Sequence, residues 1–374
     1  MAFSLALNPS SGPLLCRTCA RRISRKQLCL SLRTFTSSPA HRKHGAVSSF
    51  APTSSPELDS IFSDFRDKVF IPAHLSQQHR DIIYKGRNHH LLSSGEPVTV
   101  EIGDEKIQLQ PIDPTKDEPS TRREFTRMLA LMKEPADWDN LPAFLEELHN
   151  AKRKLSEAHM EKMVRKASEA GRQDVVLNCA RKVEKTGMAL KNVTLVCEVL
   201  WGIRAKAIRA DWDEETTAKA LKQAEQVIDM LEDVDHCGGA RRNVGDPRLQ
   251  PEIIGALLEL ATARAVKHQG GQDLDGRVRT YTDRLMARWE NPRMVAEIDT
   301  LDAANLRLVT LVPIWNGLSQ ARRFFDDGST QAVWLKGHWE ILDGLIAGAL
   351  NMVEKAGPRK RPLRGVLCYD EIAA

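Results

Sequence analysis

AHMEKMVRKASEAGRQDVVLNCARKVEKTGMALKN, residues 158–192, contains two helical patterns of apolar residues separated by the pair Gly171-Arg172. The two apolar stripes are Met160, Met163, Val164 and Ala167, and then Val176, Cys179, Ala180 and Val183. Gly187 closes the second pattern, and glycine favours a helix end because it lacks a Cβ and readily adopts left-handed backbone angles. The stretch therefore predicts a helix, a short turn and a second helix. A unit of about 35 residues cannot bury its own apolar faces, so it requires neighbouring units packed against it.

Similar helical patterns continue on both sides of this unit. Helix pairs are expected to begin near residues 122, 158 and 193, a spacing of about 35 residues. Asp213 is suited to cap the second helix of the third pair, because its carboxylate can accept hydrogen bonds from the first helical N–H groups. The sequence therefore predicts a mainly α fold with a helix-hairpin repeat of the α-solenoid type at residues 121–235.

The carboxyl-terminal part of the chain is expected to be helical as well. Residues 250–355 predict a further helical array, which includes a helix at 251–267 that is apolar on most sides. We expect Pro313 to interrupt a later helix, because proline lacks the N–H that an α-helix needs. Residues 356–374 form a basic tail in this prediction.

Residues 57–112 predict a small α+β segment. Two short helical patterns are followed by two runs in which apolar and polar side chains alternate, namely Val98, Val100 and Ile102, and then Ile107 and Leu109. Gly103-Asp104 separates the two runs, and such a pair between alternating runs is typical of a β-hairpin.

The amino-terminal residues differ in composition from the rest of the chain. No Asp or Glu precedes Glu57, whereas residues 1–35 contain six basic residues, namely Arg17, Arg21, Arg22, Arg25, Lys26 and Arg33. A basic, Ser-rich and acid-poor start is typical of a mitochondrial transit peptide. The sequence around Arg33 and Phe35 resembles an Arg-x-Phe cleavage site, so we expect a transit peptide at 1–35 and a disordered leader at 36–56. A disordered basic tail is the alternative interpretation.

Cleavage after Phe35 would change the charge of the chain. The full chain has 54 Lys and Arg against 50 Asp and Glu, a formal net charge of +4. Removal of the six basic residues leaves 48 against 50, or −2. A mature protein with this charge is not a general polyanion binder, so any RNA binding must come from local basic patches.

Residues 158–192 resemble a pentatricopeptide repeat in their length and in three local motifs, with tetratricopeptide repeats as the related alternative. The matching residues are Ala170-Gly171-Arg172 at the turn, Asp174 and Leu177 in the second helix, Lys185-Thr186-Gly187 near its end, and Val193-Thr194 at the start of the next unit. The resemblance covers roughly a third of the chain, because the flanking units match in length and pattern only. It implies stacked helical hairpins that bind organellar RNA and read bases through two or three side chains per repeat.

By this resemblance, the base-reading positions would be Lys162 and Asn192, with Cys197 in the next unit. Asn192 is a usual polar choice, whereas Lys162 and Cys197 are not, so we derive no base code. The resemblance also implies a protein-docking role, because short degenerate arrays of this kind dock proteins, including on mitochondrial ribosomes.

Two basic clusters are candidates for contacts with RNA phosphates. The candidate residues are Arg241 and Arg242 in a Gly-rich loop, and Arg359, Lys360, Arg361 and Arg364 in the tail. The alternative interpretation for both clusters is that these side chains are simply solvated at the surface and bind no RNA. Lys152-Arg153-Lys154 follows a predicted helix, and we interpret it as charge that complements the helix dipole.

The sequence predicts no catalytic, cofactor or metal site. It contains no Walker loop, G-x-S-x-G, H-E-x-x-H or dinucleotide-binding motif, so no small-molecule substrate is expected. His74, His79 and His89-His90 lack the accompanying spacing of a metal site. No apolar run approaches the length of about 18 residues that a membrane span needs, so we expect no integral membrane segment.

The leading hypothesis is a non-enzymatic helical-repeat protein of the mitochondrial matrix that serves organellar gene expression. Its expected partners are mitochondrial ribosomal proteins, mitochondrial RNA or both, and a ribosome subunit or associated factor fits best. One alternative is a stability or translation factor for a mitochondrial mRNA. The other is an assembly scaffold for a respiratory complex that binds no RNA.

Overall fold

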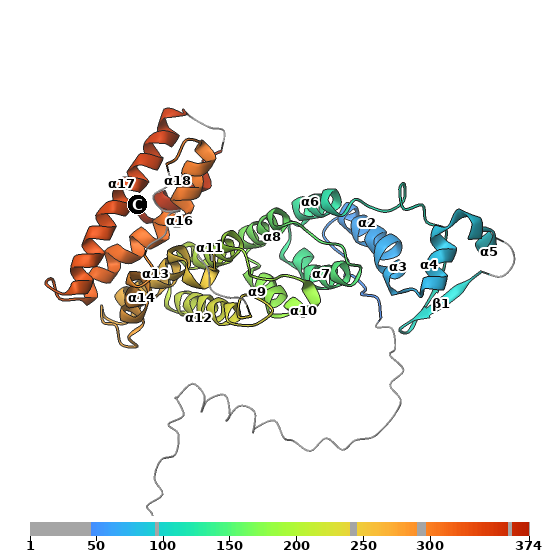
Figure 1. Ribbon diagram of the computed structural model, residues 1–374, viewed down its shortest axis with the longest axis horizontal. Helices are drawn as coiled ribbons and strands as arrows, with labels where there is room; N and C mark the ends of the chain where they lie inside the picture. The colour runs from blue at the N-terminus through green and yellow to red at the C-terminus, as the bar shows by residue number, and fades with distance from the viewer. Residues whose placement is uncertain (1–45, 94–96, 240–244, 290–296, 358–360, 374) are drawn as a thin grey trace, which may run out of the picture. The chain divides into compact units, whose positions relative to one another are not determined.

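The computed structural model describes residues 46–93, 97–239, 245–289, 297–357 and 361–373 (Figure 1). Within these ranges the chain is mainly helical, and its sheet is a single antiparallel hairpin. The predicted mainly α class is therefore confirmed. The predicted transit peptide at 1–35 lies outside the described residues.

The first described part, up to residue 109, contains short helices and the hairpin. Its elements are α2 (Pro56–Phe65), the π-helical turn η1 (Arg66–Phe70), α3 (Ile71–His74), α4 (Gln77–Tyr84), the 3-10 turn η2 (Gly86–Asn88), α5 (His90–Ser93), β1 (Thr99–Ile102) and β2 (Glu105–Gln108). Val100 lies opposite Ile107 in the ladder, and Gly103 turns the chain at a φ of 62°. The predicted β-hairpin is confirmed, because alternation and a glycine turn are local signals that do not depend on distant residues.

The middle of the chain consists of helices in sequence order. They are α6 (Thr121–Leu131), the 3-10 turn η3 (Pro135–Asn140), α7 (Leu141–Asn150), α8 (Glu157–Glu169), α9 (Gln173–Arg181), α10 (Val183–Thr186), α11 (Val193–Arg209) and α12 (Glu214–Leu231). The first helices of the three predicted pairs begin at Thr121, Glu157 and Val193, within one residue of the expected starts. Helix α8 packs against both α6 and α11 (Figure 1).

Local chemistry sets several of these helix ends. Gly171 and Gly187 both have left-handed backbone angles, with φ values of 73° and 69°. Asp213 accepts a hydrogen bond from the backbone N–H of Thr216, so the predicted cap of α12 is confirmed.

The last part contains the longest helices. Its elements are the 3-10 turn η4 (Pro247–Leu249), α13 (Pro251–His268), α14 (Arg277–Met286), α16 (Leu301–Ala321), the 3-10 turn η5 (Arg322–Phe324), α17 (Thr330–Lys355) and α18 (Arg364–Ala373). Helix α16 packs against α13, α17 and α18. At the crossing with α13, a Cβ added to Gly255 would lie 2.6 Å from Cγ1 of Ile314, so glycine allows the two helices to approach closely.

The expected interruption at Pro313 is wrong, and the expected basic tail is partly helical. Helix α16 continues through Pro313, which is buried, because packing against three neighbouring helices outweighs the cost of about 3 kcal/mol that proline brings to a helix interior. Residues 364–373 of the expected basic tail form α18, whose Cys368 is buried.

Within the described ranges, no helix has both the length and the apolar composition needed to cross a membrane.

In the described part of the expected disordered leader, residues 46–55 are instead an extended strap attached to η3 and α7, and Pro56 begins α2. Val47 is buried, and Ala51 exchanges two hydrogen bonds of 2.9 Å with the side-chain amide of Asn140. The backbone N–H and hydroxyl of Ser54 donate to the carboxylate of Asp137. The composition of the strap gave no sign of this order, because its partners lie more than 80 residues away in the sequence.

A buried carboxylate on α7 also holds the strap. The backbone N–H and the hydroxyl of Ser48 both lie 2.8 Å from Oε1 of Glu147, and Nε2 of His74 lies 2.9 Å from Oε2. Burial raises the pKa of Glu147, but the hydrogen bonds from His74 and Ser48 outweigh burial, and the pKa lies below its ordinary value of 4.5.

This shift predicts a pH-dependent contribution to stability. Because the folded state lowers the pKa of Glu147, its contribution is fully present above the unfolded-state pKa and is lost as the pH falls through the folded-state value. We expect Glu147→Gln to cost about 1–3 kcal/mol at neutral pH, and we expect this cost to shrink on acidification, because a protonated Glu147 resembles glutamine. Urea unfolding of both proteins between about pH 7 and pH 3 measures the difference. A difference that stayed constant over this range would contradict the prediction.

Candidate functional site

Of the three positions that the repeat resemblance implies for base reading, Asn192 and Lys162 occupy different environments. Asn192 caps α11: its Oδ1 accepts from the backbone N–H of Thr194 at 2.7 Å, and its Nδ2 donates to Oε2 of Glu157 at 2.5 Å. The polar groups of Asn192 are thus used within the chain, which gives a structural reason for asparagine at this position. Lys162 lies half-buried on α8.

Of the six candidate phosphate-binding residues, two lie within the described ranges. Arg241, Arg242, Arg359 and Lys360 lie outside them. Arg361 is exposed just before α18. Arg364, at the start of α18, donates from Nη1 to Oε1 of Glu198 at 2.5 Å, and its guanidinium carbon lies 3.7 Å from the ring centroid of Trp201.

The environment of Arg364 fastens α18 to α11. The side chain of Glu198 is only 10% exposed, and Arg165 also approaches it at 3.5 Å. A charged pair that is largely removed from water and stacked on an aromatic ring stabilises the contact between two helices. The structure therefore places the charge of Arg364 against a carboxylate of its own chain.

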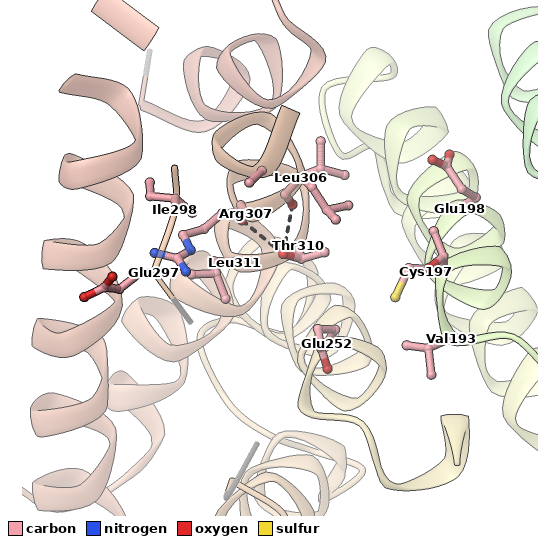
Figure 2. Close-up of a pocket in the computed structure, with 13 residues that line it drawn as sticks. Val193, Cys197, Glu198, Glu252, Glu297, Ile298, Leu306, Arg307, Thr310 and Leu311 are labelled. Carbon is pink, nitrogen blue, oxygen red and sulfur yellow. Dashed lines mark hydrogen bonds between the residues drawn. The ribbon is translucent and has the colours of Figure 1, made fainter. Parts of the chain in front are cut away.

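A pocket of about 310 Å³ lies between α11 and α16, close to the first turn of α13 (Figure 2). Val193 and Cys197 line it from α11, and Leu306 and Thr310 line it from α16. In Figure 2 the side chain of Cys197 points from α11 toward the α16 residues. Thr310 donates its hydroxyl hydrogen bond to the backbone oxygens of its own helix, so this wall is apolar in character.

Charged residues stand at the edges of this pocket. They are Glu198, Glu252, Glu297 and Arg307. Burial lowers the pKa of Arg307. The arrangement can accommodate an apolar side chain with a polar neighbour. Over the described ranges, no group of three or more His, Cys, Asp or Glu side chains could hold a metal ion.

The pocket predicts a difference in cysteine reactivity. Burial raises the pKa of the Cys179 thiol to about 12, and Cys368 is fully buried, whereas Cys197 is half-buried and lines the pocket. Because the thiolate is the reactive form, we expect iodoacetamide to modify Cys197 at least tenfold faster than Cys179 or Cys368, as a rough estimate. Peptide mass spectrometry after timed labelling measures the three rates. Equal rates in the folded protein would contradict the pocket geometry.

Sequence reasoning missed this pocket, because its two walls come from helices more than 100 residues apart. The apolar pattern of α16 indicated a helix but not which of its faces would remain open. The sequence indicated Cys197 as a small core residue on an apolar helix face, and the repeat resemblance implied a base-reading position there.

The fold defines a class, namely mainly helical proteins whose packed helices leave a pocket between them. The family model of mitochondrial ribosomal protein mS27 matches residues 33–371 of the chain. The small ribosomal subunit protein mS27 of Neurospora crassa is 31% identical over 274 residues, which cover 69% of each protein. The chain belongs to the mitochondrial ribosomal protein mS27 family, and it is a protein of the mitochondrial ribosome.

Proposed function

We propose that the chain is a non-enzymatic structural component of the small subunit of the mitochondrial ribosome, located in the matrix, and that it binds neighbouring ribosomal proteins and rRNA. The observation that carries this proposal is the family match over residues 33–371. The relative from Neurospora crassa bears the name of a small-subunit protein, which supports the choice of subunit. The basic, acid-poor residues 1–35 support import into the matrix.

The helical hairpins at residues 121–235 are proposed to act as a degenerate, pentatricopeptide-like array that docks proteins. Three hairpins that begin 36 residues apart, at Thr121, Glu157 and Val193, support this proposal, as does the packing of α8 against both α6 and α11. The capping role of Asn192 favours protein docking over base reading. The basic residues around Arg361 remain proposed contacts with rRNA phosphates.

Sucrose-gradient sedimentation of a detergent lysate of mitochondria, with and without ribonuclease, tests the function. We expect the wild-type protein to migrate with the small ribosomal subunit and to shift when ribonuclease degrades the rRNA. Migration in small fractions that ribonuclease does not change would favour an assembly scaffold without RNA. Migration in ribosome-free fractions that ribonuclease does change would favour an mRNA factor.

A further inference from the structure

We propose that the surface around the loop 151–156, between α7 and α8, binds the phosphate backbone of RNA. This inference rests on the proposed function, because it assigns an rRNA contact to particular side chains. None of these residues belonged to the basic clusters that the sequence suggested for RNA.

Two hollows lie on either side of this loop and share Arg153. The first has a volume of about 310 Å³ and is lined by Arg80 of α4 and by Lys152. The second has a volume of about 390 Å³ and is lined by Arg122 of α6 and by Lys154. The two hollows together therefore carry five cationic side chains from three separate segments of the chain.

The positive charge of this surface is largely uncompensated. Glu118 is the one carboxylate among the residues that line the two hollows, and it pairs with Arg153. No carboxylate of the described residues lies within ion-pair distance of the other four cations, namely Arg80, Arg122, Lys152 and Lys154. The chain as a whole has almost equal numbers of acidic and basic residues, yet unpaired positive charge is concentrated on this surface. Such a local concentration of positive charge is what binding of phosphate groups requires.

Lys152 has a backbone conformation that is unusual for lysine. Its φ is 56°, in the left-handed region just after the C-terminus of α7, and the backbone N–H of Arg153 bonds back to the carbonyl of Leu148 at 2.9 Å. Glycine fits this position of a helix end with least strain. Lysine at this position therefore carries a conformational cost. A lysine inside the last turn of α7 would complement the helix dipole equally well without that cost, so the dipole alone does not explain Lys152.

Unpaired polar atoms accompany the cations. Nε of Arg80 and the hydroxyl oxygen of Thr121, which lines the second hollow, are both buried without a hydrogen-bond partner in the described structure. Both groups are hydrogen-bond donors, and a phosphate oxygen would reach them only after side-chain rearrangement, so the cations that line the hollows carry the binding.

The chemistry of the surface favours RNA over a protein partner. Protein interfaces are anchored by large apolar or aromatic side chains. The exposed large apolar side chains among the described residues lie elsewhere, namely Leu91, Val234, Leu274, Leu306, Val333, Ile341 and Leu367. In the first hollow Val69 and Pro72 are buried and Tyr84 is half-buried, so the surface exposes cations but no large apolar side chain, which matches a phosphate backbone.

The test measures binding of the full chain to a fluorescein-labelled 20-base-pair RNA duplex by anisotropy over a range of KCl concentrations. The triple variant Arg122→Gln, Lys152→Gly, Lys154→Gln is expected to bind at least about tenfold more weakly and to reduce the slope of log K against log[KCl] by about 2–3. Lys152→Gly alone is expected to weaken binding while its Tm is no lower than that of the wild type, because glycine relieves the left-handed backbone. Loss of binding in that variant cannot then be attributed to unfolding.

The matched control removes three exposed lysines from α11 and α12, namely Lys206→Gln, Lys219→Gln and Lys222→Gln. It has the same net charge as the test variant and is expected to keep the wild-type slope. The proposal is overturned if the test variant binds the duplex like the wild type, or if the control loses as much affinity. It is also overturned if the substitutions abolish binding of a poly-glutamate peptide and leave RNA binding intact, because the surface would then recognise an acidic protein.

The two proposals can fail separately. If the wild-type protein sediments away from the ribosome, the proposed function falls whatever the RNA measurement gives. If the wild type sediments with the small subunit while the test variant binds RNA unchanged, only the assignment of this surface falls.

Discussion

Replacing Glu259 with alanine is expected to lower the free energy of unfolding by about 3–5 kcal/mol, because it leaves the guanidinium of Arg204 buried without its counter-charge. Glu259 and Arg204 are 0% and 1% exposed, and Nε of Arg204 lies 2.5 Å from Oε2 of Glu259. Burial disfavours the charged form of Arg204, but Glu259 outweighs burial and raises the pKa of Arg204 above its ordinary value. Urea unfolding followed by far-UV circular dichroism measures the loss.

The effect should extend over four helices. Asn316 of α16 donates to Oε1 of Glu259 on α13 at 2.8 Å, and Arg204 of α11 donates to Sγ of Cys368 on α18 at 3.3 Å. We therefore expect hydrogen exchange in Glu259→Ala to accelerate in α11, α13, α16 and α18 before it accelerates in α2 to α7.

Two controls separate the lost charge from the lost volume. The double variant Arg204→Met, Glu259→Leu removes both charges and is expected to recover most of the stability, because an apolar pair of similar size needs no counter-charge. Glu169→Ala breaks the exposed pair with Lys166 and is expected to change stability by less than about 0.5 kcal/mol. A loss of less than about 1 kcal/mol in Glu259→Ala would show that the pair is not buried as described.

Phe144→Ala is the second substitution with a large expected effect, a loss of about 3–5 kcal/mol. Phe144 of α7 is fully buried at the centre of an aromatic cluster. Its ring centroid lies between 5.0 and 6.2 Å from those of five other rings, namely Phe50, Phe62, Phe65, Phe70 and Phe125. Truncation removes these contacts and leaves a cavity that the surrounding helices cannot fill.

The size and the place of this loss are both testable. Phe144→Leu keeps most of the volume and is expected to cost less than about 1.5 kcal/mol, whereas Val234→Ala, at a side chain 76% exposed, should cost less than about 0.5 kcal/mol. Because the cluster joins the strap and α2 to α7, hydrogen exchange should accelerate first in residues 46–70. Equal costs for Phe144→Ala and Phe144→Leu would contradict the cluster.

Elements that depend on short stretches of sequence were predicted well. The turn at Gly171, the helix end at Gly187, the cap at Asp213 and the hairpin turn at Gly103 each follow from side-chain chemistry within a few residues. The helical spacing of apolar residues likewise placed the starts of α6, α8 and α11 within one residue. A role in the mitochondrial ribosome was the leading hypothesis from the sequence, and the family match confirms it.

Tertiary contacts decided the features for which the sequence carried no local signal. Ser/Pro/Ala-rich residues 46–56 are ordered because Asp137, Asn140 and Glu147 accept their hydrogen bonds. Helix α16 continues through the buried Pro313, and α16 as a whole packs against α13, α17 and α18. In both cases an interaction with distant residues outweighs a local preference of a few kcal/mol.

The sequence alone determined that the chain is mainly helical, where α6, α8 and α11 begin, where the hairpin turns, and that its start is basic and free of acidic residues. The tertiary structure alone decided which charges are paired. Arg364, selected for RNA by its sequence context, is matched with Glu198 some 166 positions away, whereas Lys152 and Arg122 have no acidic partner among the described residues. The physical reason is that helix formation follows a periodicity of 3.6 residues, which can be read along the chain. Whether a charged side chain is paired depends instead on distant residues that packing brings within a few ångströms of it.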